Sequence, residues 1–234
     1  MDIARATQAL ADASSSLTRA HDVVGSLSAL LENCKTGLGV DAGGVLVIAP
    51  SGRLELLAAS SHRALELEVH QLHVGGGPCV EAFETRTTVQ AHSPEQLCGR
   101  WPSFAPTMLE AGLLSVHAAP LVWHGTVLGA MGLFRRSDVA FSPDEDAVAR
   151  AFADIATMLV LNVGEIDASR LAERLTEALD SRIVVEQAKG VLAEQQAIDM
   201  AEAYDRLVRD AIDHGRQLTS WAAEVVAGAQ WRKA

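Results

Sequence analysis

The sequence predicts two linked domains: an α/β (α+β) domain with a mainly antiparallel sheet flanked by helices, followed by an all-α three-helix bundle. A length of 234 residues fits about two domains. Short β-branched runs separated by turn residues fill the stretch 43–134, whereas the C-terminal part carries helical periodicity. We place an amphipathic coiled-coil helix at 1–38, the α/β domain at 39–164 and the helical bundle at 165–232.

Composition excludes several classes of protein. With 49% hydrophobic and 21% charged residues the chain is not disordered by composition. Apolar runs such as Val127–Phe134 are far shorter than the roughly 18 residues that cross a bilayer, and no secretory signal precedes them, so we expect a cytoplasmic protein without a membrane span. Cys34, Cys79 and Cys98 have neither zinc nor disulfide spacing, which predicts reduced thiols and neither a metal nor a cofactor.

The N-terminal region carries a heptad pattern. Apolar or small residues alternate at spacings of three and four at Ile3, Ala6, Leu10, Ala13, Leu17, Ala20, Val24, Leu27, Leu31, Cys34 and Leu38. This spacing predicts one long helix that pairs with a second copy in a coiled coil, giving a homodimer. Because alanines weaken such a seam, the alternative is a helix that packs on its own domain.

The next stretch predicts an antiparallel sheet. Pro50-Ser51-Gly52 is a hairpin turn between the first two strands, and Pro78 opens a short helix that ends at Arg86. A second hairpin turns at His124-Gly125. The predicted strands are Gly44–Ala49, Leu54–Ser60, Val69–Val74, Ser115–Val122 and Val127–Phe134.

The remainder predicts helices. Ser142 and Glu145 form a capping box that begins a helical segment reaching Leu192, with a bend near Gly164. Asp199 caps the next helix, which ends before Gly215, and Leu218-Thr219 begins the last one. Such a small bundle has little core of its own, so docking or dimerisation is expected to support it.

The helical part resembles a known family. The segment Leu179–Leu192 contains Arg182, Ile183, Gln187-Ala188-Lys189-Gly190 and Leu192, and is similar to the first helix of ANTAR domains, whose hallmark is R..I.QAKG.L. The resemblance continues through 201–211 and 218–226. Ala193 and Ala197-Ile198 depart from the family pattern, the latter where a glycine-containing turn is usual.

The front part is similar to the GAF domains that precede ANTAR modules. The matching segments are Gly77–Phe83, Arg100–Pro102, Ser115–Leu121 and Leu128–Phe134. The two resemblances imply a non-enzymatic transcription antitermination regulator, usually a dimer, whose output module binds two-hairpin leader motifs in nascent RNA under control of the GAF domain. The alternative is a ligand- or redox-sensing GAF scaffold whose helical tail docks a protein partner.

Residue chemistry gives RNA binding only local support. Residues 165–234 hold nine Lys and Arg against thirteen Asp and Glu, a balance of −4. Support for RNA binding therefore has to come from where the cations lie on the helices and not from net charge. The candidate cations are Arg182, Lys189, Arg206, Arg209 and Arg216, and Gln187 and Tyr204 are candidates for contacting an unstacked base. Solvated ion pairs of Arg182 with Glu186 and of Arg206 with Asp210 are the alternative.

The last helix argues against DNA as the target. A helix-turn-helix protein presents polar and basic residues from its recognition helix to the major groove. The stretch 220–229 contains no Lys or Arg, and its only charged residue is Glu224. RNA is therefore the preferred nucleic acid.

The front domain offers weaker candidates. Gly75–Gly77 lacks the phosphate-loop ending, and His70 and His73 lack a third metal ligand. Cys79 stands at a predicted helix N-terminus, where the helix dipole lowers a thiol pKa and favours redox sensing. A small-molecule pocket is expected from Phe83, Trp101, Phe104 and His117 by analogy of fold, although these aromatic rings fit a core equally well.

Overall fold

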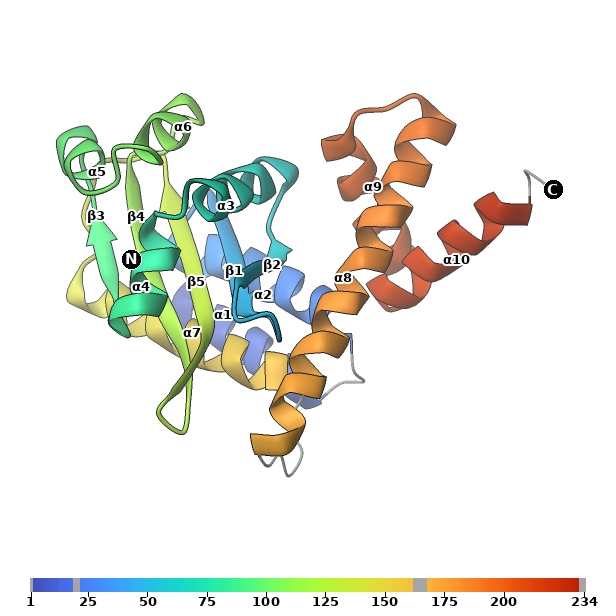
Figure 1. Ribbon diagram of the computed structural model, residues 1–234, viewed down its shortest axis with the longest axis horizontal. Helices are drawn as coiled ribbons and strands as arrows, with labels where there is room; N and C mark the ends of the chain where they lie inside the picture. Colours follow the sequence, from blue (N-terminus) through green and yellow to red (C-terminus); the bar gives the residue numbers. More distant parts are fainter. Residues whose placement is uncertain (1, 19–21, 162–167, 232–234) are drawn as a thin grey trace.

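The computed structural model describes residues 2–18, 22–161 and 168–231. Within them a five-stranded sheet has the order β2-β1-β5-β4-β3, with every neighbouring pair antiparallel (Figure 1). The strands are β1 (Ala42–Ile48), β2 (Leu54–Ala59), β3 (Val89–Ala91), β4 (Ser115–Trp123) and β5 (Thr126–Arg135). The expected mainly antiparallel sheet is confirmed.

Helices cover both faces of this sheet. Alternate residues of each strand point to opposite faces, so two cores form, one on each side. One face carries α1 (Ile3–Ser15), α2 (Val23–Leu38) and α7 (Pro143–Leu161). The other carries α3 (His62–Val74), α4 (Pro78–Thr85), α5 (Pro94–Arg100) and α6 (Ala105–Glu110).

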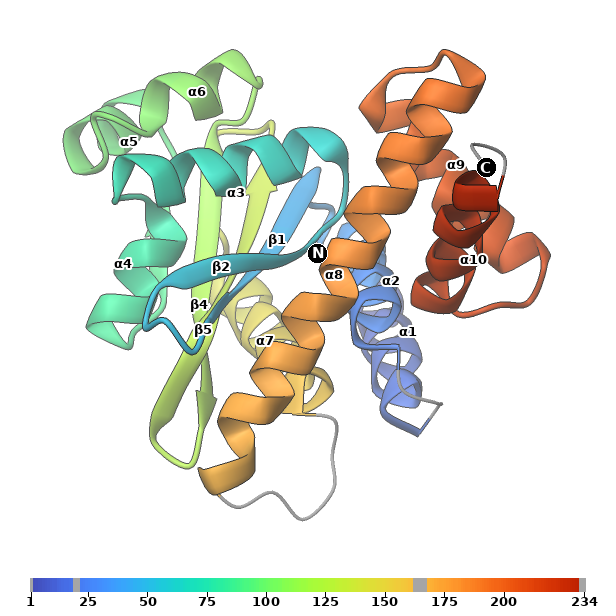
Figure 2. The ribbon, with the colours of Figure 1, turned by 45° about the vertical axis from the view of Figure 1, so that its right-hand side comes forward.

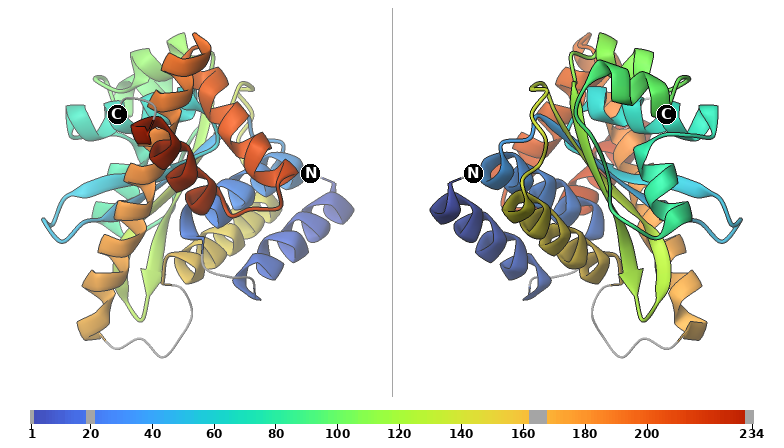
Figure 3. Two further views of the ribbon diagram at one scale, coloured as in Figure 1. Left: turned by 90° about the vertical axis from the view of Figure 1, so that its right-hand side faces the viewer. Right: turned by 90° about the vertical axis from the view of Figure 1, so that its left-hand side faces the viewer.

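The N-terminal region is a helical hairpin, so the prediction of one continuous helix was wrong. Helix α1 ends at Ser15, a short 3-10 turn follows at Ser16–Thr18, and α2 begins after Asp22, which caps it. Consecutive serines favour backbone alternatives to a helix. The seam residues Ala6 and Ala13, and the neighbouring Ala9, are buried within the chain, where α1 packs against α2 (Figure 3).

The predicted strand at Val69–Val74 is also wrong, because these residues belong to α3. Ser61 caps this helix by accepting a hydrogen bond from the Ala64 amide at 3.2 Å. Ala64, Leu67, Glu68 and Gln71 recur at helical spacing and are buried on one face. His70 and His73 therefore lie on a helix rather than at a strand end.

Both the second hairpin and the predicted capping box are confirmed. His124 and Gly125 have φ values of 47° and 80°, as a two-residue turn with left-handed backbone requires. At the start of α7 the Ser142 amide donates to Glu145 Oε2 at 2.9 Å, and the Glu145 amide donates to Ser142 Oγ at 3.3 Å.

The C-terminal part is helical, as predicted. It consists of α8 (Ala168–Gln196), α9 (Met200–Asp213) and α10 (Leu218–Trp231). Figure 2 shows α8 running past the edge of the sheet formed by β2. The predicted bend near Gly164 lies outside the described residues.

The front domain and the helical part share one core. Buried residues of α8, α9 and α10, such as Val185, Leu207 and Ala222, are continuous with the core between α2, α7 and the sheet. The small bundle is thus supported by docking. In the described ranges no helix is long and apolar enough to cross a membrane.

Candidate functional site

All candidate RNA-binding residues except Arg216 lie on the hairpin of α8 and α9, which has a well-formed turn. Helix α8 ends in a Schellman motif, in which the Ile198 amide donates to the Ala193 carbonyl at 3.2 Å and Ala197 adopts a φ of 52°. Asp199 then caps α9 by accepting from the Glu202 amide at 2.8 Å. The departure at Ala197 therefore leaves the turn intact, with alanine in a conformation that favours glycine.

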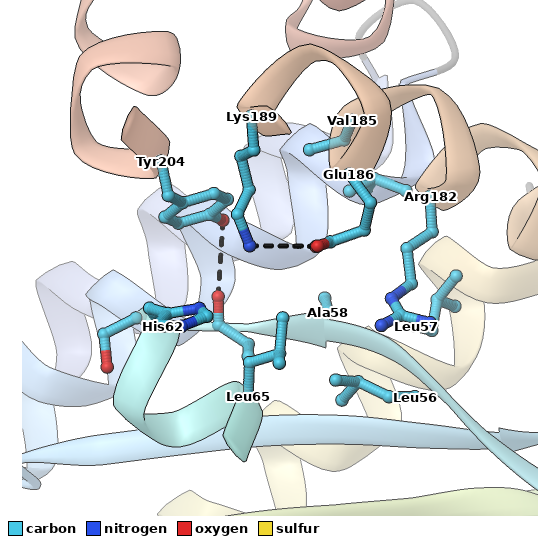
Figure 4. A pocket seen from close by; sticks show the side chains of 13 residues that line it. Leu56, Leu57, Ala58, His62, Leu65, Arg182, Val185, Glu186, Lys189 and Tyr204 are labelled. Atoms are coloured by element: carbon cyan, nitrogen blue, oxygen red, sulfur yellow. Dashed lines mark hydrogen bonds and ion pairs between the residues drawn. The ribbon is translucent and has the colours of Figure 1, made fainter. Parts of the chain in front are cut away.

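One face of α8 packs against the front domain. Arg182, Val185, Glu186 and Lys189 recur at helical spacing and line a small pocket, together with Tyr204 from α9. Figure 4 shows these side chains pointing toward β2 and the start of α3. The opposite wall of the pocket is formed by Leu56, Leu57, Ala58, Ala59, Ser61, His62 and Leu65.

Lys189 lies at the centre of this contact and is fully buried. Its Nζ is 3.0 Å from Glu186 Oε2 and 5.5 Å from the centre of the Tyr204 ring (Figure 4). Charge pairing and a cation–π contact reduce the cost of removing the ammonium group from water. The alternative to RNA binding was an ion pair between Arg182 and Glu186. In the structure Glu186 pairs with Lys189 instead.

Tyr204 is a contact between the two domains. Its hydroxyl donates to the Ala59 carbonyl at 3.3 Å and lies 3.0 Å from Ser28 Oγ. Burial raises the pKa of the phenol, and the hydrogen bond with Ser28 opposes that rise. In this arrangement the ring is turned toward β2 and α2 rather than toward solvent.

The other candidates do not join Lys189 on one exposed surface. Arg206 pairs with Asp210 at 3.6 Å, as the alternative held, and Arg216 pairs with Glu224. Arg182 and Arg209 form no ion pair with any residue the structure describes. Gln187 is exposed. The expectation that the cations converge on one exposed surface is not met in the docked arrangement.

Cys79 is not the reactive thiol that its position predicted. It is fully buried at the start of α4, and desolvation raises its pKa well above the usual value, with the charge of Glu68 adding to the rise. Its Sγ donates to Glu68 Oε1 at 3.7 Å. Burial outweighs the helix dipole here because a thiolate loses its hydration entirely.

The four aromatic candidates do not line one pocket. Phe83, Trp101 and Phe104 pack in or against the core beneath α3 to α6. His117 is buried on the opposite face, where its Nε2 lies 2.8 Å from Asp146 Oδ1 and its ring packs on Phe141. Burial lowers the pKa of His117, and the Asp146 carboxylate opposes this effect.

A buried polar cluster was missed by the sequence reasoning. Gln71 Nε2 donates to Glu68 Oε2, and Gln71 Oε1 accepts from the Cys79 amide at 3.0 Å. A Cβ on Gly132 would lie 2.6 Å from Cys79 Sγ and 2.8 Å from Glu68 Oε1, so glycine leaves the space that this cluster fills. Reading 62–74 as a helix would have placed Glu68 and Gln71 on its apolar face and revealed the cluster. No three His, Cys, Asp or Glu side chains among residues 2–18, 22–161 and 168–231 form a group that could hold a metal ion.

Asp22 joins the two domains, a contact that the sequence reasoning did not indicate. Its Oδ1 accepts from the Gly25 amide at 3.0 Å and caps α2, while its Oδ2 accepts from the Thr219 amide at 3.3 Å at the start of α10. One carboxylate thus serves the N-termini of two helices from different domains. An acidic residue just before Val23 is a capping signal, but only the fold brings α10 to it.

Comparison with known families matches both parts of the chain. The model of the GAF domain matches residues 20–160, and the model of the ANTAR domain matches residues 173–226. No curated protein sequence matches the chain.

Solved structures resemble the front part. The GAF domain of a phosphoenolpyruvate-protein phosphotransferase from Coxiella burnetii is 15% identical, with a TM-score of 0.52 over 78% of this chain and 99% of that one. The fRMsr of Staphylococcus aureus in its reduced form is 17% identical, with a TM-score of 0.50 over 66% of this chain and 94% of that one. At these identities the likeness shows the fold alone.

Proposed function

The chain belongs to the GAF domain family and continues into an ANTAR domain, and from this architecture we propose that it is a signal-responsive, RNA-binding regulator of transcription antitermination. The observation that carries the proposal is the ANTAR match over 173–226, which contains Arg182, Lys189, Arg206 and Arg209. The target is a two-hairpin motif in nascent transcripts, and the protein acts in the cytoplasm as a homodimer.

The chemistry of the output helices supports RNA over DNA. Helix α10 carries no Lys or Arg in its described stretch 218–229, so it offers no cations to a major groove. Arg182 and Arg209 form no ion pair with the described residues, and Arg209 is exposed in the docked arrangement. Unpaired arginines are the side chains that gain most from phosphate contact, because no protein ion pair has to break first.

The front domain is proposed to act as a sensor without catalysis. The cysteines that a redox enzyme of this fold would need to combine are separated, since Cys34 is buried on one face of the sheet and Cys79 on the other. Cys98 is exposed. A small molecule recognised by the GAF domain is the proposed signal.

RNA titration tests the proposal. A two-hairpin RNA is titrated with the full chain at several salt concentrations, and binding should weaken as salt rises. Arg182→Ala with Arg209→Ala should lower the affinity and reduce the salt slope by about 1 per lost phosphate contact. The matched control removes Arg53 and Arg86, two exposed arginines of the front domain. Salt-independent binding, or equal losses in both double variants, would reject the proposal.

A further inference from the structure

We infer that the docked arrangement is a closed state, in which the front domain covers the RNA-binding face of α8, and that Asp22 and Tyr204 form the latch that holds it closed. This inference rests on the proposed function. It adds a specific mechanism of regulation: the edge of the sheet at β2 competes with RNA for the same side chains.

The first observation is the position of Lys189. This residue belongs to the ANTAR-like segment, yet it is fully buried beneath β2 and α3. A lysine binds phosphate as an exposed point charge, so Lys189 has to leave this contact before it can reach RNA. Arg182 lines the same pocket, so separation of α8 from β2 would release two cations together.

The second observation is the pair of polar contacts between the domains. Asp22, which is 6% exposed, holds the start of α10 through the Thr219 amide while it caps α2. A carboxylate at two helix N-termini interacts favourably with both helix dipoles. The Tyr204 hydroxyl holds α9 to the Ala59 carbonyl and Ser28. Each contact joins a residue of the GAF region to one of the ANTAR region.

The third observation is that docking is incomplete. A groove of about 960 Å³ remains between α2 and the α9–α10 pair. Polar residues such as Ser26 and Asn33 line one side, and Val208 and Ile212 line the other, with Ile212 71% exposed. Apolar surface that stays exposed at an interface adds nothing to the free energy that holds the two parts together. The closed state is therefore reversible, and its population depends on the latch.

Latch variants should increase the apparent affinity for RNA. If only a fraction of the molecules is open, the apparent dissociation constant is raised by the inverse of that fraction. Asp22→Ala and Tyr204→Phe should each tighten binding of the two-hairpin RNA by about 10-fold in the full chain. Tyr204→Phe keeps the aromatic ring, so any stacking on RNA is retained.

Opening can also be measured without RNA. The chain has three lysines, at positions 35, 189 and 233, so labelling by an amine-reactive reagent can be followed site by site by mass spectrometry. In the wild type Lys189 should react at least about 10-fold more slowly than Lys35, whose side chain is 36% exposed. Both latch variants should bring the rate at Lys189 toward that at Lys35.

The matched control is Asp2→Ala. Asp2 caps α1 through the Ala4 amide and is exposed, so this variant removes one carboxylate and one helix cap without touching the latch. It should leave both labelling and RNA affinity unchanged. If Asp22→Ala fails to fold, Tyr204→Phe carries the test.

The outcomes separate the two proposals. If Lys189 is labelled as fast as Lys35 in the wild type, the inference of a closed state is wrong. Faster labelling of Lys189 in the latch variants without a gain in RNA affinity overturns the competition between β2 and RNA. If neither wild type nor latch variants bind RNA in a salt-dependent way, while labelling shows the expected latch, the proposed function fails and the interface serves another output.

Discussion

Glu68 is the most perturbed carboxyl group of the front domain. Desolvation raises its pKa from 4.5 to about 8, although hydrogen bonds from Cys79 and Gln71 oppose the rise. Gly44 and Gly132 leave the space that its side chain fills against β1 and β5. At neutral pH the group is therefore protonated and is part of the packed core rather than a buried charge.

Glu68 should make stability depend on pH. Between pH 4.5 and about 8 the unfolded chain ionises this group and the folded chain keeps it protonated. The folded state then binds more protons, so the unfolding free energy falls as pH rises, by up to about 1.4 kcal/mol per pH unit. Glu68→Gln should remove that slope in urea titrations from pH 5 to 8. The exposed Glu66→Gln on the same helix is the control, and an unchanged slope in Glu68→Gln would contradict the assignment.

Ala197 should be a site where substitution stabilises. Its φ of 52° is costly for a residue with a Cβ and free of strain for glycine. Ala197→Gly should raise the unfolding free energy by up to about 1 kcal/mol. Gln195→Gly, two residues earlier and helical, should lower it by about 0.5–1 kcal/mol. Chemical denaturation of both variants checks this, and a loss in both would contradict the account.

At the scale of elements, the start of α7 joins three parts of the front domain. Arg135 at the end of β5 donates to Glu145 Oε1 at 2.8 Å and to the Leu38 carbonyl at 2.6 Å. Its guanidinium also lies 3.8 Å from the centre of the Phe141 ring. The same Glu145 completes the capping box with Ser142. The pair of Arg135 and Glu145 thus aligns α7 with the sheet, and Arg135 also joins both to the end of α2.

This arrangement predicts unequal effects of two substitutions. Ser142→Ala removes a helix cap and should cost about 1 kcal/mol of unfolding free energy. Arg135→Ala breaks a mostly buried ion pair and removes the guanidinium that donates to Glu145 Oε1 and to the Leu38 carbonyl, so it should cost about 3–5 kcal/mol. Thermal and urea unfolding measure both. Equal losses would show that the ion pair contributes no more than the cap.

The elements also show what the sequence could predict. Hairpins and caps were foreseen because their signals are local, as in His124-Gly125 and in Ser142 with Glu145. The strand expected at Val69–Val74 failed because a short apolar alternation fits both a strand and one face of a helix. The heptad seam predicted a single helix, whereas α1 and α2 pack against each other, because spacing records which residues are apolar but not which partner buries them.

Prediction of the candidate site was limited in the same way, because local spacing does not show which segment packs on a helix face. Spacing placed Arg182 and Lys189 on one face of a helix, and they do share a face. Nothing in the local sequence says that β2 covers that face, or that Asp22 reaches α10 across almost the whole length of the chain. Contacts between distant segments depend on how the domains dock, and they decide which cations are exposed.

At the scale of the whole molecule, the proposed function requires an acidic protein to bind a polyanion. The net charge of −11 repels RNA at long range, so binding depends on local cations that are not already neutralised. Arg206 and Arg216 are held by Asp210 and Glu224, both exposed or partly exposed. Such surface ion pairs contribute little to stability, so they can be removed at small cost.

Freeing these arginines should strengthen RNA binding. Asp210→Asn and Glu224→Gln each release one cation and remove one negative charge near the site, so the affinity should rise and the salt slope should steepen by up to about 1 for each new phosphate contact. Glu55→Gln, an exposed carboxylate of the front domain, changes the net charge equally and controls for long-range repulsion. Because a screened long-range effect raises affinity without adding a phosphate contact, the slope separates the two causes. A gain in affinity that is the same in all three variants, with an unchanged slope, would mean that Arg206 and Arg216 do not touch RNA.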